Sequence, residues 1–218
     1  MMFVASATNK TVIAANGTIT KNKQKTIIID AGHGGVDSGA VSCTGLSESI
    51  INLQISLRLN SMFHLLGYKT KMIRTEDISV YTEGDTIAKK KISDLKERVR
   101  IVNTTTNAIL ISIHQNYFKE SQYHGAQVFY CNNENSAALA ELLQSNFRKF
   151  DSNNHRKHKK ASGIYLLDHI ECTGILIECG FISNPKEEVL LRNSDYQKNL
   201  CAVIAATTVL FLDQQTIN

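Results

Sequence analysis

The sequence lacks the features that define several classes of protein. Its 218 residues include one proline and no tryptophan. The longest apolar run, 200–212, is interrupted by Thr207 and Thr208 and is shorter than the about 18–20 apolar residues that span a membrane. Five cysteines are too few for a disulfide scaffold, and no CxxC spacing indicates cysteine-bound zinc. The composition excludes collagen-like, disordered and coiled-coil classes, which leaves a globular domain.

Neither sign of charge dominates the chain. Lysine and arginine together number 24, aspartate and glutamate 20, and the formal net charge is +4. No dense field of basic residues covers the sequence, so we expect no nucleic-acid partner. A mildly basic balance fits an anionic polymer at a surface.

The N-terminal segment 1–25 is polar and lacks the apolar core of an intact signal peptide. We interpret it as what remains after a targeting region has been removed, followed by one domain over 26–213 and a short tail, 214–218. A single domain of this size buries about 70% of the surface of its unfolded chain and needs no disulfides to fold.

Short β-branched runs alternate with segments of helical periodicity. This alternation implies an α/β fold, a single domain in which a mostly parallel sheet is flanked by helices on both faces. The predicted strands are 26–29, 68–74, 108–114, 125–130, 164–167 and 174–178, and the predicted helices are 46–66, 94–104, 136–150, a short one opened by Pro185, and 195–213.

Two long connections interrupt this rhythm, and both carry runs of basic residues. The first, 76–92, contains three consecutive lysines at 89–91, and the second, 151–162, contains a run of six basic residues and histidines at 155–160. Each run is either a solvated surface or an anion-facing rim near a site.

Four residues with chemically active side chains lie where predicted strands end or a helix begins. His33 follows the first strand within a glycine-rich loop, His114 and Glu178 end two later strands, and Glu48 opens the long helix. Ligands of open α/β sheets bind beyond the carboxyl ends of the strands. Two imidazoles and a carboxylate are a known ligand set for catalytic zinc, and a second carboxylate can act as general base. Taken singly, a histidine at a strand end is more often structural, and Glu48 suits a helix dipole.

Three blocks of sequence together carry a family resemblance. They are IIIDAGHGG at 27–35, SIHQN at 112–116 and IECGFISN at 177–184. In order and spacing they resemble the zinc-dependent N-acetylmuramoyl-L-alanine amidases, and the likeness runs from about residue 26 to residue 212. The resemblance implies the zinc exopeptidase-like amidase fold and hydrolysis of the amide between N-acetylmuramic acid and the L-Ala of peptidoglycan stem peptides.

The resemblance also implies a role for each matching residue. His33, Glu48 and His114 match the family's Zn²⁺ ligands, and Glu178 matches its catalytic glutamate. Arg74, in an Arg-Thr-x-Asp strand end, and Asn116 are expected to bind substrate. Leu95, Arg98 and Asn103 match the helix that follows.

An extended segment, 78–93, departs from the common family pattern. Its ending, KKKISDLKER at 89–98, is similar to the spore germination-specific amidases, which act on cortex peptidoglycan and prepare muramic-δ-lactam formation. That similarity implies an extracytoplasmic protein of the cell wall or spore envelope. No helix in the sequence is expected to plug the site, so we predict an open cleft and control in trans by an activating partner protein.

Two other functions stay open. One is a zinc carboxypeptidase or aminopeptidase of wall peptides, for which Arg156, Lys159 or Lys160 would supply a clamp for a free peptide terminus. The other is a non-catalytic wall-binding module. Cys179 is not expected to be a nucleophile, because its side chain should point away from that of Glu178 along a strand. The cysteines are expected to be buried free thiols.

Overall fold

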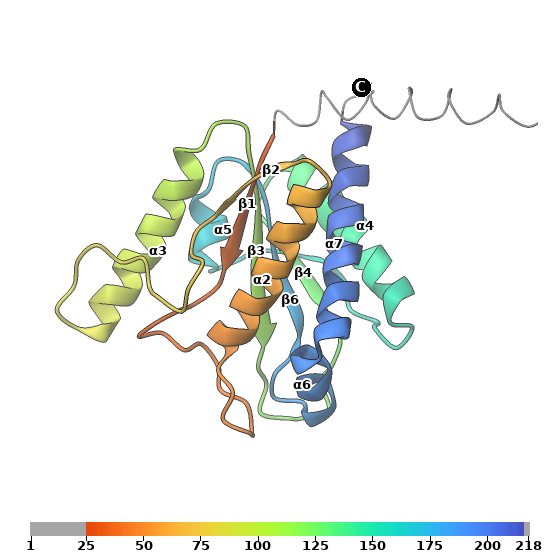
Figure 1. Cartoon of the computed structure of the whole chain (residues 1–218), viewed down its shortest axis with the longest axis horizontal. Helices are drawn as coiled ribbons and strands as arrows, with labels where there is room; N and C mark the ends of the chain where they lie inside the picture. Colours follow the sequence, from red (N-terminus) through yellow and green to blue (C-terminus); the bar gives the residue numbers. More distant parts are fainter. Residues whose placement is uncertain (1–24, 216–218) are drawn as a thin grey trace, which may run out of the picture.

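The computed structural model describes residues 25–215 and contains one six-stranded sheet with helices on both sides (Figure 1). Except for Lys25, the predicted N-terminal segment lies outside the described residues, as do the last three residues of the tail. The strands are β1 (Thr26–Ala31), β2 (Lys69–Met72), β3 (Ala108–Asn116), β4 (Gln127–Tyr130), β5 (Lys159–Lys160) and β6 (Thr173–Phe181). The helices are α2 (Glu48–Leu65), α3 (Ile87–Asn103), α4 (Glu134–Phe150), α5 (Tyr165–His169), α6 (Pro185–Arg192) and α7 (Ser194–Gln214).

The order of the strands is β2-β1-β3-β6-β4-β5. β1, β2, β3 and β6 run parallel, whereas β4 is antiparallel to β6 and carries the short β5 at the edge. The predicted class, an α/β domain with a mostly parallel sheet between helices, is therefore confirmed. No helix among residues 25–215 is long and apolar enough to cross a membrane.

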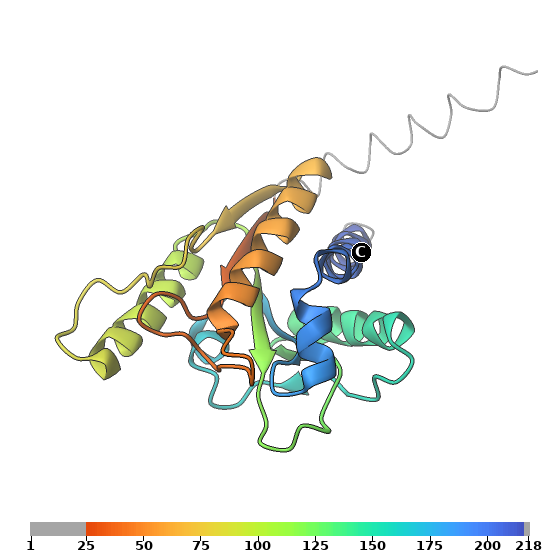
Figure 2. The ribbon, with the colours of Figure 1, turned by 60° about the horizontal axis from the view of Figure 1, so that its bottom comes forward.

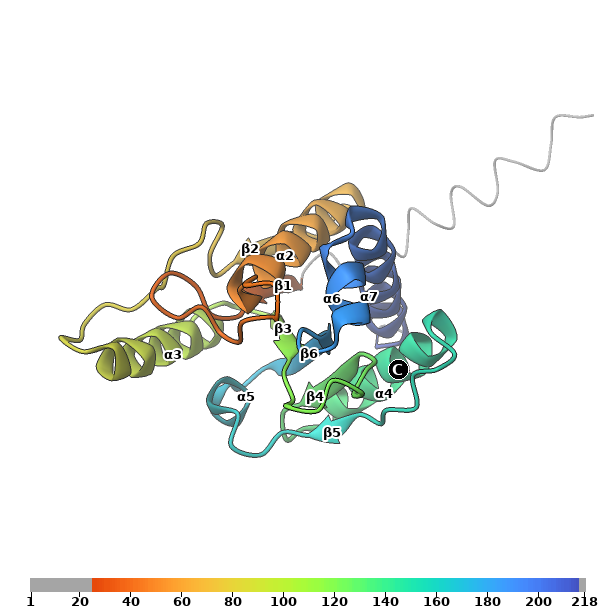
Figure 3. The ribbon, with the colours of Figure 1, turned by 90° about the horizontal axis from the view of Figure 1, so that it is seen from below.

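The two faces of the sheet are covered unequally. Ile27, Ile109 and Ile177 belong to the larger core, which packs against α2, α4 and α7. Ile28 and Leu110 alternate with them and face a smaller core under α3 and the five-residue α5. Seen along the strands in Figure 3, α2, α6, α7 and α4 lie on one side of the sheet and α3 and α5 on the other. The second face is thus less completely covered.

The carboxyl ends of β1, β3 and β6 meet at one edge, where the connecting loops gather (Figure 2). Along the thinly covered face, the apolar residues give way at this edge to polar ones. Every second residue of a strand lies on the same face, so Ser112 and His114 share this face with Leu110 on β3. On β6, Glu178 shares it with Leu176. The sheet therefore presents its polar side chains beside the open edge.

The predicted strand 164–167 is wrong, because these residues begin helix α5. Gly163 adopts a positive φ of 75° and turns the chain, and Ile164 then occupies the N-cap position of the helix. Leu166 and Leu167 are both buried, as consecutive residues of a helical turn can be. A four-residue apolar run does not distinguish a strand from a buried helical turn.

Two further elements lie within the predicted long connections. α3 starts at Ile87 rather than 94, and its N-cap residue Thr86 accepts a hydrogen bond from the backbone N–H of Lys89. The lysine run 89–91 therefore lies within the first two turns of a helix. Lys159 and Lys160 form β5 at the edge of the sheet, where lysine discourages further strand pairing.

Candidate active site

His33 is held by a tight loop directly after β1. Its own φ is 60°, a left-handed conformation that is uncommon for a residue with a side chain, and Gly34 and Gly35 also have positive φ. Reciprocal backbone hydrogen bonds join Gly34 and Asp37. The turn brings the Asp37 carboxylate to 2.9 Å from His33 Nδ1, which leaves Nε2 directed at Glu48, 3.3 Å away.

Glu48, the first residue of α2, is a buried carboxylate with hydrogen-bond partners on both oxygens. Oε1 lies 3.0 Å from His114 Nδ1 and accepts the backbone N–H of Gln115 and the side-chain amide of Asn52. Oε2 accepts the N–H of Ala40 and faces His33. The helix start therefore fixes the carboxylate between two imidazoles rather than merely complementing a helix dipole.

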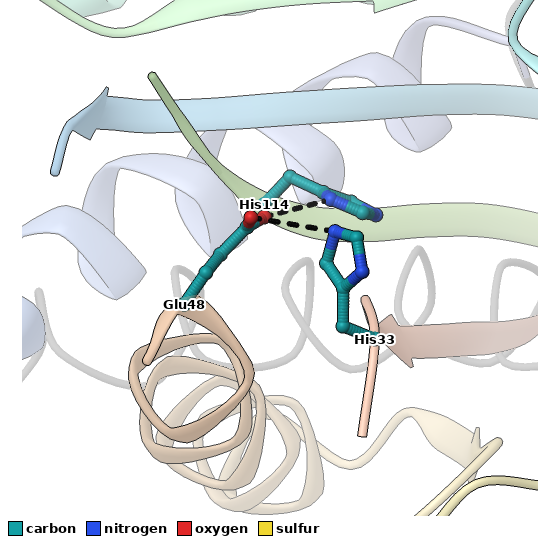
Figure 4. Close-up of side chains that lie close together, drawn as sticks. All are labelled: His33, Glu48 and His114. Carbon is teal, nitrogen blue, oxygen red and sulfur yellow. Dashed lines mark hydrogen bonds and ion pairs between the residues drawn. The ribbon is translucent and has the colours of Figure 1, made fainter. Parts of the chain in front are cut away.

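His114 lies on β3 with its ring directly over Gly32. A Cβ on Gly32 would lie 2.1 Å from His114 Nε2, so only glycine leaves room for the ring. The centroids of the His33 and His114 rings are 4.9 Å apart. Figure 4 shows the two imidazoles converging on Glu48, and one ligand atom from each of the three residues lies within 4.8 Å of the others.

The electrostatics of this triad favour a cation among its donor atoms. Burial alone would lower the pKa of His33, but hydrogen bonds to Asp37 and Glu48 outweigh it and raise the pKa to about 9. Burial would raise the pKa of Glu48, and the imidazoles of His114 and His33 hold it well below its ordinary value instead. Two imidazole nitrogens and a carboxylate fit Zn²⁺, which takes three protein ligands in catalytic sites and keeps one position open.

Glu178 lies beside the triad, because it is in register with His114 across the β3–β6 pair. Its Oε2 is buried and has no hydrogen-bond partner in the described part of the chain. Burial chiefly raises the pKa of Glu178, to about 7, with a further rise from Glu48 and an opposing effect of His114. Such a carboxylate can accept a proton near neutral pH. Cys179 belongs to the core on the opposite face, and burial raises its thiol pKa well above the ordinary value, so it is no nucleophile.

The structure does not bring Arg74 to the open site. The side chain is fully buried, and the guanidinium donates to the backbone carbonyls of Ala31, Gly32, Ser49 and Glu76. With its donors bound to backbone, Arg74 cannot reach substrate, and the expectation that it binds substrate is corrected to a positioning role for the His33 loop.

Arg98 of α3 supports the same loop from the other side. It is paired with the buried Asp30 and with Asp94, and it donates to the carbonyl of His33 at 2.8 Å. Asn116 ends β3 half-buried, with its carbonyl bonded to Ile182 N, and its role toward substrate stays a prediction.

Asp37 and Lys91 are the residues that sequence reasoning missed. Lys91 Nζ of α3 lies 2.8 Å from Asp37 Oδ1, so a lysine of the basic run supports the carboxylate that orients His33. A metal-bound histidine usually donates its second ring nitrogen to a carboxylate. The one available signal was the position of Asp37, four residues after His33.

A cavity of about 260 Å³ opens beside the triad. His33 and His114 line it together with residues of α3 and α5, and their imidazoles are 26% and 19% exposed. The open cleft and control in trans stay predictions.

Two histidines and a carboxylate converge beside a second carboxylate, a donor set of the kind that holds a catalytic metal ion in hydrolases. Residues 27–208 match the family described as N-acetylmuramoyl-L-alanine amidase. The chain belongs to this family of peptidoglycan hydrolases.

Individual relatives agree with this membership. The germination-specific N-acetylmuramoyl-L-alanine amidase of Bacillus subtilis (strain 168) is 35% identical over 182 residues, 83% of this chain and 76% of the relative. The amidase LytC of the same organism is 28% identical over 190 residues, 86% of this chain and 35% of LytC. Among solved structures, the CwlD amidase from Clostridioides difficile, in complex with the GerS lipoprotein, has a TM-score of 0.83 and 37% identity, covering 86% of this chain and 98% of that one.

Proposed function

We propose that the chain hydrolyses the amide between N-acetylmuramic acid and L-Ala with Zn²⁺ held by His33, Glu48 and His114 and with Glu178 as general base. The observation that carries this proposal is the register of Glu178 with His114, which sets an unpaired carboxylate beside three convergent ligand atoms. A bound zinc ion would polarise the scissile carbonyl and acidify water at the site.

The side chains of the chain divide the remaining work. Asp37 holds the proton of His33 Nδ1 and keeps Nε2 turned toward the other ligands. Glu178 takes the proton of the attacking water and returns it to the leaving amine of L-Ala, a role that suits a pKa of about 7. The apolar cores on both faces fix the strands that carry these groups, so the ligands are preorganised.

Spore cortex peptidoglycan is the substrate that we assign. Support comes from the 35% identity to the germination-specific amidase and from the KKKISDLKER sequence, which forms most of α3. Action on this polymer is extracytoplasmic. The structure of the CwlD amidase is a complex with a lipoprotein, which supports an activating partner for this chain also.

The test is the substitution Glu178→Gln, assayed on purified cortex muropeptides. The variant is expected to keep stoichiometric zinc and to lose about 10²–10⁴-fold in kcat. Wild type should release intact stem peptides with a new L-Ala amino terminus. Glu171→Gln, at an exposed position before the other end of β6, is the matched control and should leave kcat unchanged.

Three results would contradict the proposal. They are wild-type turnover by Glu178→Gln, full activity of a metal-free protein, and shortened peptides left on intact muramoyl groups, which would instead identify an exopeptidase. Full activity of the isolated chain on cortex fragments would contradict only the need for a partner.

A further inference from the structure

Arg156 is a fixed guanidinium without a carboxylate partner near the catalytic strand ends. Its Nε donates to the carbonyl of His124 at 2.8 Å, and its Nη1 donates to Gln127 Oε1 at 3.1 Å. The guanidinium carbon lies 4.2 Å from the centroid of the Phe181 ring. No Asp or Glu oxygen lies within 4.0 Å of its nitrogens among residues 25–215.

Gln127 connects this arginine to the catalytic carboxylate. Gln127 of β4 is the register partner of Glu178 on β6, so their side chains lie on the same face of the sheet, with Cβ atoms about 5 Å apart. The buried Gln127 side chain is itself fixed, because its amide donates to the carbonyl of Lys157 at 2.8 Å. The guanidinium is therefore bonded to the residue that pairs with Glu178 across the two strands.

The carboxylate that acts on Arg156 at longer range is Glu187, whose two oxygens accept the backbone N–H groups of Gly125 and Phe181. A shallow hollow of about 460 Å³, within the size range of ligand sites, adjoins Arg156. The residues that line this hollow include no acid; they are Gln122, Tyr123, His124, Asn153, His155 and Arg156. In Figure 3 the segment that leads from α4 into β5 runs along the outer edge of the sheet, beside β4.

We infer that Arg156 binds a carboxylate of the stem peptide on the leaving side of the scissile amide. This inference rests on the proposed function. Two extended residues span about 7 Å, so a peptide whose L-Ala nitrogen lies at Glu178 carries the side carboxylate of its second residue to the region of Arg156. Stacking and two internal hydrogen bonds fix the guanidinium before substrate arrives, which lowers the entropy lost on binding.

The experiment uses two muramoyl-L-alanyl peptides that differ only at the second stem residue. Its carboxylate is free in one and a carboxamide in the other. Wild type should have a kcat/KM about 10- to 100-fold higher on the carboxylate substrate, the value of a charge-assisted hydrogen bond. Arg156→Gln should reduce this ratio to near one by slowing only the carboxylate substrate, and Arg156→Lys should restore part of it.

Lys157→Gln is the matched control, because it removes one positive charge from the adjacent exposed residue and should keep the wild-type ratio. Equal turnover of both substrates by wild type, or equal loss on both in Arg156→Gln, overturns the inference while amide hydrolysis persists and the proposed function stands. Loss of the ratio in Lys157→Gln also overturns it, since general charge would then suffice. Failure of wild type to cleave either substrate overturns the proposed function and the inference together. The wild-type ratio alone decides the matter if the arginine variants do not fold.

Discussion

Glu178 places a carboxylate near the carboxyl end of β6, between buried neighbours, and its Oε2 has no hydrogen-bond partner among the described residues. Burial is the main reason that its pKa stands at about 7 instead of 4.5. A carboxyl group with a raised folded-state pKa destabilises the fold when it ionises. The proposed general base is therefore expected to have a measurable cost in stability.

We predict that Glu178→Gln stabilises the metal-free protein at pH 8 and not at pH 4. Between about pH 4.5 and 7 the unfolded chain loses this proton before the folded chain does, so the free energy of unfolding falls as the pH rises. The full effect is at most about 3.5 kcal/mol, at about 1.4 kcal/mol per pH unit. Thermal unfolding of both proteins with chelator present, across this pH range, measures it. A difference in Tm that does not change with pH would contradict the assignment to ionisation.

Gly32 allows a second prediction at the scale of one residue. The His114 ring occupies the space that a Cβ on Gly32 would need. The φ of Gly32 is not positive, so Gly32→Ala should displace the ring without straining the backbone. We expect zinc affinity to fall at least about tenfold, measured by competition with a chelating dye. Gly45→Ala is the control, because that Cβ would meet nothing within 4 Å although its φ of 86° carries backbone strain. Equal losses of affinity in the two variants would refute a specific contact with His114.

At the scale of the element, α3 is joined to the metal ligands by side chains. Lys91 pairs with Asp37, which orients His33, and Arg98 holds the carbonyl of His33. Sequence-based reasoning found Arg98 through its resemblance to the family but described residues 76–92 as a connection. Because α3 begins at Ile87, Lys91 lies on a rigid helix and points to the site.

We predict that Asp37→Asn weakens zinc binding by about 10- to 100-fold, the usual loss when a ligand histidine loses its carboxylate partner. Asp85→Asn is matched to it, since Asp85 also pairs with a lysine of α3, Lys89, at 2.8 Å, but on the exposed surface. That control should bind zinc as wild type does, because exposed pairs contribute little. Isothermal titration with zinc compares the two variants, and equal affinities would contradict a role for Asp37.

The elements differ in how far sequence could predict them. The run 108–113 has a β-branched isoleucine at every second position, which favours a buried strand, and the glycine-rich loop follows from its composition. The run 164–167 is too short for its hydrophobic period to distinguish a strand from a helix. In the structure the turn at Gly163 starts a helix there, and the sequence alone does not predict that turn. The link from Arg156 through Gln127 to Glu178 depends on antiparallel pairing of β4 with β6, which local pattern does not reveal.

At the scale of the whole molecule, the proposed zinc site joins elements that are distant in sequence. His33 follows β1, Glu48 opens α2 and His114 lies on β3, and these elements meet at one edge of the sheet. A ligand that binds only the folded state stabilises it in proportion to the logarithm of its concentration over its dissociation constant. Zinc should therefore stabilise the entire domain, not only the loop around His33.

We predict that chelation lowers Tm and abolishes hydrolysis, and that zinc restores both. Zinc at 100 times its dissociation constant should add about 2.7 kcal/mol to the free energy of unfolding, which for a domain of this size raises Tm by about 5–10 °C. Glu178→Gln should keep the zinc-dependent rise in Tm, because Glu178 is not a ligand, whereas His114→Ala should lose it. Calorimetry with and without zinc on the three proteins separates metal binding from catalysis. A zinc-dependent rise in Tm that persists in His114→Ala would show that zinc binds elsewhere. If zinc does not raise the Tm of wild type, the proposed zinc centre between β1, α2 and β3 is contradicted.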